Sequence, residues 1–283
     1  MQTTRANTLN KLAASLTPIY GKREALSIAK LSLEEVFGWT QRDYILDSNT
    51  PVEINEHTLS ELTEQLLTSK PVQYVLGKAR FLDLELNVAS GVLIPRDETE
   101  LLVNWIKQEN SRGKILDIGT GSGAISIALA MDSCFELTAV DVSEDALKIA
   151  CSNAQLHGLD IKLKQVDILK PDADFIETSR FDIIVSNPPY IPESEKATMR
   201  NNVLDFEPHL ALFVPDNDPL LFYREIAKLA LRILNNTGKL YFEIHENYAS
   251  KTVELLENLG YTNIELRKDI NDKARMIRCQ KNL

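Results

Sequence analysis

A glycine-rich turn near the middle of the chain carries the first residues whose types could do chemistry. Residues 115–124 read Ile-Leu-Asp-Ile-Gly-Thr-Gly-Ser-Gly-Ala, so an apolar strand leads into alternating glycines and then into an apolar helix. Glycine lacks a Cβ, which permits positive φ and lets a ligand touch the main chain where a parallel strand ends and a helix begins. Alone, the pattern is weak evidence, because it fits a dinucleotide fold with Ala124 in the third glycine position almost as well.

Two acidic residues beside this turn narrow the choice of ligand. Asp117 precedes the turn, where a carboxylate would attract an ammonium group and repel a diphosphate. Asp141 closes the next predicted strand, where a carboxylate can accept hydrogen bonds from both hydroxyls of a ribose. S-adenosylmethionine has a cationic end and a ribose, so we predict that it is the ligand. The competing interpretation is that Asp117 only caps a turn and Asp141 is a solvated strand end.

The most specific segment is Asn187-Pro188-Pro189-Tyr190, which follows an apolar strand at 181–186. Two prolines remove two backbone donors, so this turn presents carbonyls and the Asn187 side chain as acceptors. An amide or aniline-like NH2 is a poor nucleophile, and acceptors on both of its hydrogens would hold its lone pair toward a methyl donor. Positioning of two reactants can be worth about 7 to 11 kcal/mol, so we expect positioning, and no general base, to drive the transfer. The alternative is a rigid loop without a chemical role.

Alternating strands and helices are expected to position both segments. The strand candidates are short apolar runs separated by helical stretches, a pattern typical of an α/β fold with a parallel sheet and crossover helices. They are residues 114–118, 137–142, 161–166, 181–186 and 239–244. Two further runs, 262–266 and 276–279, are separated by a short charged loop, which predicts an antiparallel pair.

The N-terminal part of the chain has a different pattern. Residues 1–75 carry apolar side chains at helical spacing, which predicts a small helical bundle, and Thr58 with Glu61 fits a capping box at one helix start. Alternation over 82–88 predicts one strand of a hairpin whose partner is 92–95. We therefore predict three parts: a helical domain at 1–75, a β-hairpin linker at 76–96 and a sheet domain at 97–283.

Composition and charge exclude several classes of function. The 283 residues are 44% hydrophobic and 25% charged, as in an ordinary globular protein. The formal net charge of -10 makes the average surface repel nucleic-acid backbones. Cys134, Cys151 and Cys279 have no metal-ligand spacing, so we expect buried thiols in a reducing compartment and no metal. The chain shows neither a signal peptide nor a membrane-length apolar run, which predicts a cytoplasmic protein.

Four motifs occur together in the chain. They are Ile94-Pro95-Arg96-Asp97-Glu98-Thr99-Glu100, Asp117-Ile118-Gly119-Thr120-Gly121-Ser122-Gly123, Asn187-Pro188-Pro189-Tyr190 and Phe206-Glu207-Pro208. Together they resemble the peptide chain release factor glutamine methyltransferases, over essentially the whole chain. The tetrapeptide is shared with adenine amino methyltransferases of DNA and RNA, so the arginine segment and the Phe-Glu-Pro triplet narrow the family. One departure is Asp97, which stands where the family usually has a second proline.

The resemblance implies a fold and an activity. The fold is a class I, Rossmann-like methyltransferase domain with a seven-stranded, mostly parallel sheet whose last strand is antiparallel. The activity is transfer of methyl from S-adenosylmethionine to the side-chain amide nitrogen of the glutamine in the Gly-Gly-Gln motif of translation release factors, with S-adenosylhomocysteine as product. The helical domain would help to bind the release factor. We expect a monomer that binds neither nucleic acid nor membrane.

The resemblance also assigns roles to residues around the substrate. The catalytic residues would be Asn187, Pro188 and Tyr190. The Asn187 side chain and the Pro188 carbonyl would grip the glutamine amide, and Tyr190 would pack against it. The remaining substrate contacts would be Pro189, Arg96 and Glu98. Glu98 has a competing structural interpretation, because acidic residues in the first turn of a helix are favoured by the helix dipole.

The cofactor would be held by residues of three strand ends and the catalytic turn. They are Asp117, Gly119, Thr120, Gly121, Ser122, Gly123, Asp141, Asp167, Ile168 and Asn187. Within this set Asp141 would hold the ribose, while Asp167 and Ile168 would flank the adenine. The family often has an aromatic residue where Ile168 stands, so stacking on the adenine is less strongly implied than the Asp167 contact.

Two other functions stay open from the sequence. Adenine amino methylation of DNA or RNA would use the same tetrapeptide on a similar planar NH2, but it predicts a basic channel that the acidic composition does not suggest. A non-catalytic protein could keep the fold as a docking platform. The intact glycine turn and the intact Asn-Pro-Pro-Tyr turn argue against that reading.

Overall fold

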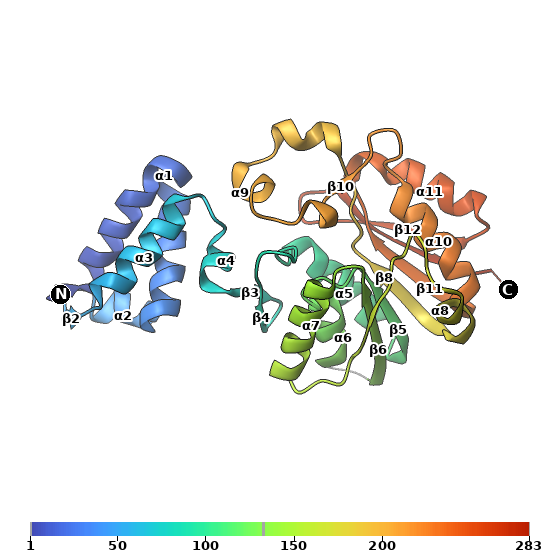
Figure 1. The fold of residues 1–283 in the computed structure, drawn as a ribbon, viewed down its shortest axis with the longest axis horizontal. Helices are drawn as coiled ribbons and strands as arrows, with labels where there is room; N and C mark the ends of the chain where they lie inside the picture. The colour runs from blue at the N-terminus through green and yellow to red at the C-terminus, as the bar shows by residue number, and fades with distance from the viewer. Residues whose placement is uncertain (1, 132–133, 283) are drawn as a thin grey trace. The chain divides into compact units, whose positions relative to one another are not determined.

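The structure, a computed structural model of the chain, describes residues 2–131 and 134–282. The chain divides into two compact units (Figure 1). One, the helical unit, comprises the chain up to Lys78 together with Arg200–Phe206. The other, the sheet unit, comprises Ala79–Met199 and the chain from Glu207 onward. A short segment after the Asn-Pro-Pro-Tyr turn thus groups with the helical unit although it is distant from it in sequence.

The helical unit is built around one long helix that Gly21 interrupts with a φ of 74°. Its elements are β1 (Gln2–Thr4), α1 (Arg5–Phe37), α2 (Gln41–Leu46), β2 (Pro51–Glu53), α3 (Glu56–Leu67), α4 (Val72–Leu76) and α9 (Asn201–Leu204). Leu16, Leu33 and Leu66 are fully buried between α1 and α3, so burial of an apolar stripe holds the unit together. The small antiparallel pair of β1 and β2 was not predicted.

The start of α3 differs from the prediction. The helix begins at Glu56, and the Asn55 side chain accepts from the backbone N–H groups of His57 and Thr58, at 3.0 and 3.4 Å. The predicted capping box of Thr58 and Glu61 is therefore wrong. Asn55 is an equally good capping residue, and it lies one turn earlier in the chain.

The sheet unit has seven strands in the order β12-β13-β11-β8-β5-β6-β7. They are β5 (Arg112–Ile118), β6 (Cys134–Asp141), β7 (Lys162–Gln165), β8 (Phe181–Ser186), β11 (Leu234–Glu243), β12 (Thr262–Lys268) and β13 (Ala274–Gln280). Only β13 runs antiparallel to its neighbours, β11 and β12. The predicted fold, a mostly parallel seven-stranded sheet with its last strand antiparallel, is confirmed, and each predicted strand of this sheet overlaps an observed one.

The hairpin differs in its pairing. The strand at Leu84–Asn87 (β4) pairs with the strand that precedes it, Lys78–Phe81 (β3), and not with residues 92–95. Leu82, which was predicted to begin the strand, sits in the connecting turn with a φ of 52°. Residues 92–96 are irregular and lead into α5.

Helices cover both faces of the sheet (Figure 1). On one side lie α5 (Asp97–Glu109), α6 (Ala124–Met131) and α7 (Glu144–Leu156); on the other lie α8 (Ala173–Thr178), α10 (Leu221–Ile233) and α11 (Ala249–Asn258). Short elements complete the unit: β9 (Ile191–Pro192), β10 (Phe213–Val214) and the 3-10 turns Glu193–Thr198, His209–Ala211 and Glu246–Tyr248. Because both faces are buried, only the ends of the strands are free to carry a site.

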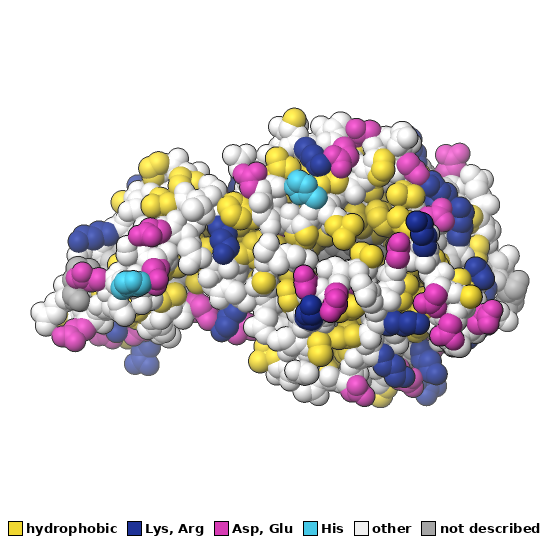
Figure 2. Space-filling view, viewed as in Figure 1, with side chains coloured by type: hydrophobic (Ala, Val, Ile, Leu, Met, Phe, Trp, Pro, Cys, Tyr) yellow, Lys and Arg dark blue, Asp and Glu magenta, His cyan; other side chains and the backbone are white. Residues whose placement is uncertain are grey.

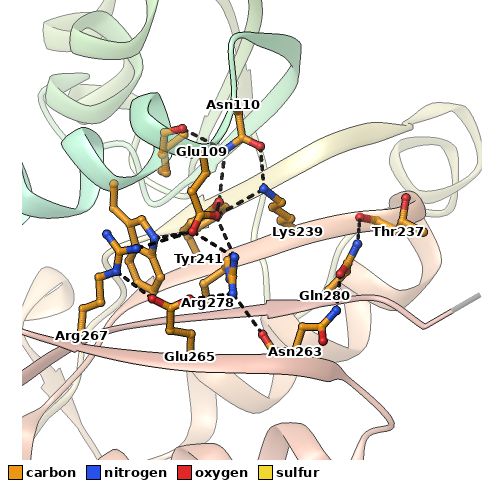
Figure 3. A network of polar contacts seen from close by, with 12 residues as sticks. Glu109, Asn110, Thr237, Lys239, Tyr241, Asn263, Glu265, Arg267, Arg278 and Gln280 are labelled. Atoms are coloured by element: carbon orange, nitrogen blue, oxygen red, sulfur yellow. Dashed lines mark hydrogen bonds and ion pairs between the residues drawn. The ribbon is translucent and has the colours of Figure 1, made fainter.

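A network of polar contacts anchors the C-terminal end of α5 to the sheet (Figure 3). The Glu109 carboxylate accepts hydrogen bonds from Trp105 Nε1, Tyr241 OH and Arg278 Nη1, at 2.7, 2.7 and 2.9 Å. Burial opposes the charge of Glu109, but these donors together with the Arg278 charge outweigh it and lower the pKa of Glu109 to about 2. The network fixes α5, the helix whose opposite end carries Thr99.

Candidate functional site

The two turns singled out in the sequence start side by side at one edge of the sheet. Strands β5 and β8 are parallel neighbours, with Asp117 opposite Val185 and Ile118 opposite Ser186. The Ser186 hydroxyl donates to the Ile118 carbonyl at 2.7 Å and ties the two strand ends together. The glycine turn and the Asn-Pro-Pro-Tyr turn therefore leave the sheet from adjacent positions.

The glycine turn, residues 119–123, joins β5 to α6. Two of its backbone N–H groups donate to the Val140 carbonyl, at 2.9 and 3.1 Å, which holds the turn against the end of β6. Gly121 has a φ of 56°, and beyond its chain neighbours no described atom lies within 4 Å of where a Cβ would stand. At Gly123 a Cβ would lie 3.0 Å from Ile127 Cδ1. Glycine thus leaves the main chain open at one position and lets the turn pack closely on α6 at the other.

Asp117 lies beneath this turn and is completely buried. Its Oδ2 accepts from the hydroxyls of Thr120 and Ser126, at 2.7 and 2.8 Å, while Oδ1 has no hydrogen-bond partner among the described residues. Burial raises the pKa of Asp117 to about 6 although both hydroxyls oppose the shift. A buried carboxylate oxygen without a donor fits the expected ammonium end of S-adenosylmethionine.

Ser122 contributes to the turn through its main chain. Its side chain is buried, and its carbonyl accepts from Asn153 Nδ2 at 2.9 Å. Asn153, on α7, also accepts from the Asn87 N–H at 2.7 Å and donates to the Asn87 carbonyl at 2.9 Å. The Asn153 side chain therefore clamps the glycine turn to the β-hairpin.

Asp141 stands at the end of β6, beside the glycine turn. Its two oxygens accept from the backbone N–H groups of Gly121 and Ser143, each at 2.9 Å. Burial raises the pKa of Asp141, and the backbone donors act against this shift. A carboxylate has about four acceptor sites, so two backbone donors leave capacity for the hydroxyls of a ribose.

Asp167 and Ile168 follow β7 and lie next to Asp141 in the fold, because the Val166 N–H donates to the Asp141 carbonyl at 3.0 Å. The Asp167 carboxylate is exposed and accepts from the Leu169 N–H at 2.9 Å. The Ile168 side chain packs against the apolar core. This places one polar and one apolar side chain at the strand end where the adenine contacts were predicted.

The Asn-Pro-Pro-Tyr turn is held by a residue of α5 and a residue of β11. Asn187 Nδ2 donates to Thr99 Oγ1 at 3.1 Å, and the Thr99 hydroxyl donates to Glu243 Oε2 at 2.6 Å. The Tyr190 hydroxyl donates to Glu243 Oε1 at 3.0 Å. Both ends of the turn are thus tied to one buried carboxylate, and the Pro188 side chain between them is buried.

Tyr190 packs edge-on against His245, with ring centroids 5.8 Å apart. Burial, followed by the nearby Glu243 charge, raises the pKa of Tyr190, so its hydroxyl stays protonated and remains a donor. His245 therefore lies close to the site, and its Nε2 is 3.4 Å from Glu195 Oε2.

Arg96 is held by the Phe-Glu-Pro segment. The buried Glu207 carboxylate accepts from Arg96 Nη2 with both oxygens, at 2.7 and 2.8 Å, and also from the Ile94 N–H at 3.2 Å. Asp97 is the first residue of α5, where proline is favoured for its fixed φ and an acid is favoured by the helix dipole. Asp97 therefore suits the position at which the family usually has proline.

Comparisons with known proteins place the chain in a family. Residues 7–77 match the family model of the PrmC N-terminal domain, and residues 96–205 match that of the methyltransferase small domain. A release factor glutamine methyltransferase of Flavobacterium psychrophilum is 43% identical over 280 residues, covering 96% of this chain and 97% of that protein. The chain belongs to the release factor glutamine methyltransferase family. A second member, from Bacteroides thetaiotaomicron, is 39% identical over 276 residues, covering 95% of this chain and 99% of that protein.

A solved structure supports the fold. A methyltransferase from Pyrococcus furiosus superposes with a TM-score of 0.55 at 16% identity, covering 79% of this chain and 100% of that one. The predicted family, enzyme class and methyl donor are thus confirmed at the level of the family, whose members are S-adenosylmethionine-dependent protein-glutamine methyltransferases. The residues at the glycine turn fit that donor, because Asp117 offers a free carboxylate oxygen and Gly121 an open main chain.

Two residues that hold the Asn-Pro-Pro-Tyr turn were not predicted as site residues. Thr99 lies within a quoted motif, but its contact with Asn187 spans 88 positions of sequence. Glu243 is an acid at the end of an otherwise apolar strand, Leu240-Tyr241-Phe242, and its burial among such neighbours was a signal that the sequence contained. Arg96 and Glu98 were predicted to contact the substrate; in the structure Arg96 is bound by Glu207, and Glu98 lies in the first turn of α5.

Within 2–131 and 134–282, no helix is long and apolar enough to cross a membrane. The same ranges contain no group of three or more His, Cys, Asp or Glu side chains placed to bind a metal ion. The three cysteines are free thiols, but only Cys279 is buried as predicted; Cys134 is exposed and Cys151 is half-buried, so the predicted burial is wrong for these two.

Proposed function

We propose that this chain transfers a methyl group from S-adenosylmethionine to the side-chain amide nitrogen of the glutamine in the Gly-Gly-Gln motif of translation release factors. The observation that carries the proposal is the orientation of Asn187. Its NH2 group is engaged by Thr99 at 3.1 Å, which leaves Oδ1 as an acceptor on a turn that leaves the sheet beside the glycine turn. An acceptor at this place suits a substrate that offers N–H donors.

The cofactor would lie along the strand ends of β5, β6 and β7. Asp117 Oδ1 would face its ammonium group and Asp141 its ribose, while Asp167 and Ile168 would flank its adenine. The open main chain at Gly121 would let it approach closely. The sulfonium supplies the methyl group and leaves as a neutral thioether.

The substrate amide would be held at the Asn-Pro-Pro-Tyr turn. Asn187 Oδ1 and the Pro188 carbonyl would accept one N–H each from the glutamine, which fixes the amide nitrogen with its lone pair toward the methyl carbon. Transfer forms the N–C bond as the S–C bond breaks, and the extra proton on nitrogen leaves afterwards to solvent. Positioning of this kind can supply about 7 to 11 kcal/mol, so no side chain with a pKa near neutrality is needed as a base.

The release factor would also be bound by the helical unit. Helix α2 exposes two large apolar side chains, Ile45 and Leu46, which are 70% and 65% exposed. Neighbouring apolar side chains of this kind on a surface are typical of protein contacts. We further propose that the enzyme acts as a monomer in the cytoplasm.

Nucleic-acid adenine is the rival acceptor. The chain carries a net charge of -10, and Figure 2 shows acidic and basic side chains interspersed on the face drawn, without a broad basic region. A basic channel is the usual requirement for binding a phosphate backbone. The charge distribution therefore supports a protein substrate.

The deciding experiment is mass spectrometry of a purified release factor after incubation with the full-length enzyme and S-adenosylmethionine. We expect the Gly-Gly-Gln peptide to gain the mass of one methylene group, and a factor with alanine in place of that glutamine to stay unmodified. Tritium transfer to DNA or RNA in parallel reactions, with an unmodified release factor, would instead support the rival acceptor.

A further inference from the structure

The Asn187 amide is not free to turn. Thr99 Oγ1 lies between Asn187 Nδ2 and Glu243 Oε2, at 3.1 and 2.6 Å. A threonine hydroxyl has one hydrogen and two acceptor lone pairs. The hydrogen of the Thr99 hydroxyl is directed at the Glu243 carboxylate, so Thr99 can only accept a hydrogen bond from Asn187. The Asn187 group that faces Thr99 must therefore be the NH2.

Glu243 is well suited to direct that hydrogen. Its side chain is 1% exposed, and its two oxygens accept from two different hydroxyls, those of Thr99 and Tyr190. A carboxylate that receives two O–H donors is an acceptor at both oxygens, whereas a neutral amide in its place would have to donate from one side. Glu243 thereby controls the direction of the Thr99 hydroxyl and of the Tyr190 hydroxyl together.

Thr99 is held firmly in this position. It lies in the first turn of α5, is buried, and its N–H donates to the Arg96 carbonyl at 3.0 Å. The other end of α5 is anchored by Glu109 to Tyr241 and Arg278 on neighbouring strands. Because both the helix and the Thr99 side chain are held in place, the Thr99 hydroxyl can set the orientation of the side chain that it contacts.

We propose that Thr99 and Glu243 are positioning residues that fix the Asn187 amide with its oxygen toward the substrate, and that this orientation makes the enzyme select a glutamine amide over a glutamate carboxylate. The proposal rests on the proposed function. A glutamine presents N–H donors to Asn187 Oδ1, whereas a glutamate at the same place presents only acceptors, so two oxygens would face each other. If Asn187 could turn over, its NH2 would donate to the glutamate carboxylate, and the discrimination would shrink.

The test compares three full-length enzymes: wild type, Thr99→Val and Thr99→Ser. Valine has nearly the shape of threonine but no hydroxyl, while serine keeps the hydroxyl. We expect kcat for the release factor to fall about 100-fold in Thr99→Val, with an unchanged Kd for S-adenosylmethionine by calorimetry, and to return close to wild type in Thr99→Ser. Wild-type kcat in Thr99→Val, or a Thr99→Ser variant as impaired as Thr99→Val, would overturn the proposal.

The selectivity arm uses a release factor whose motif glutamine is replaced by glutamate, as a competitor of the normal factor. Wild type should bind the glutamine factor more tightly than the glutamate factor. We expect this preference to shrink about tenfold in Thr99→Val and to shrink also in Glu243→Gln. An unchanged ratio in both variants would overturn the proposal, since a loss of folding alone would weaken both factors equally. If the wild-type enzyme leaves the normal factor unmethylated, the proposed function fails instead.

Discussion

Glu207 accepts hydrogen bonds from Arg96 Nη2 with both carboxylate oxygens, at 2.7 and 2.8 Å, and the Glu207 side chain is 1% exposed. The pair joins the Phe-Glu-Pro segment to the irregular segment before α5, and the same carboxylate accepts from the Ile94 N–H at 3.2 Å. Two motifs that are far apart in the sequence are thus held together by one buried carboxylate.

The first prediction concerns this pair. Arg96→Gln leaves the buried Glu207 carboxylate without its cation, so we expect a loss of about 1.5 to 3 kcal/mol of stability. In a Glu207→Gln background, adding Arg96→Gln should leave KM for the release factor unchanged, because the pair is already broken. A further rise of KM in the double variant would show that Arg96 also contacts the substrate directly, as its sequence motif implied.

The second prediction concerns the packing of the glycine turn. Gly123 and Gly158 both have left-handed φ values, 84° and 66°, so alanine meets a similar backbone strain of about 1 to 2 kcal/mol at either position. Only at Gly123 would the Cβ also press on Ile127 and Ala150, at 3.0 and 3.3 Å. We expect Gly123→Ala to lower the melting temperature more than Gly158→Ala and to weaken S-adenosylmethionine binding as well. Equal losses in the two variants would contradict this account.

The third prediction concerns Asp141. Asparagine in its place would turn an NH2 group toward one of two backbone donors, those of Gly121 and Ser143. The ribose hydroxyls would then lose a charged acceptor, and a hydrogen bond to a charged group is worth about 1.5 to 3 kcal/mol, so we expect the Kd for S-adenosylmethionine to rise about 10-fold to 100-fold in calorimetry. The control is Asp160→Asn on an exposed loop, which should bind as wild type does. Wild-type affinity in Asp141→Asn would remove its assigned role.

The fourth prediction is a pH dependence of stability. The pKa of Glu109 is lowered from 4.5 to about 2, so Glu109 stabilises the folded state fully above pH 4.5 and loses this contribution as the pH falls toward 2. Glu109→Gln should therefore cost about 3 kcal/mol at neutral pH, and the difference from wild type should shrink in acid. Urea unfolding followed by Trp105 fluorescence in a Trp39→Phe background reports on the sheet unit. The control, Glu136→Gln, removes a carboxylate that is 68% exposed and should change little. A difference in unfolding free energy between wild type and Glu109→Gln that stays constant with pH would contradict the lowered pKa of Glu109.

Local patterns allowed most of the fold to be predicted. Apolar strands between helices, a glycine turn after β5 and the Asn-Pro-Pro-Tyr turn after β8 are properties of short segments, and the strand ends brought them together as expected for a parallel sheet. The predicted hairpin partner, 92–95, was wrong, because the strand at 84–87 pairs with 78–81, a segment for which no strand was predicted. The chain turns at Leu82, where φ is 52°, and leucine gives no indication of a positive φ in the sequence.

The residues that hold the Asn-Pro-Pro-Tyr turn could not be predicted from local sequence patterns. Thr99 reaches Asn187 and Glu243 across 88 and 144 positions of sequence, and such contacts arise only when α5 packs on the sheet. Glu207 belongs to the Phe-Glu-Pro triplet that narrowed the family, but its contact with Arg96 forms only in the folded chain. For Glu243 the sequence signal was an acid directly after the apolar run Leu240-Tyr241-Phe242, whereas Glu207 lies between Asp205 and His209 and carried no such signal.

The central claim is that Asn187 holds the substrate amide while the glycine turn holds the methyl donor. Its most direct test is methylation of a release factor by wild type and by Asn187→Ala, followed on the Gly-Gly-Gln peptide by mass spectrometry, with S-adenosylmethionine affinity measured on the same preparations. We expect wild type to methylate the glutamine and Asn187→Ala to lose at least about 100-fold in rate while its affinity for S-adenosylmethionine stays close to that of wild type. Near-normal turnover by Asn187→Ala, or a folded release factor left unmodified by the wild-type enzyme, would contradict the claim.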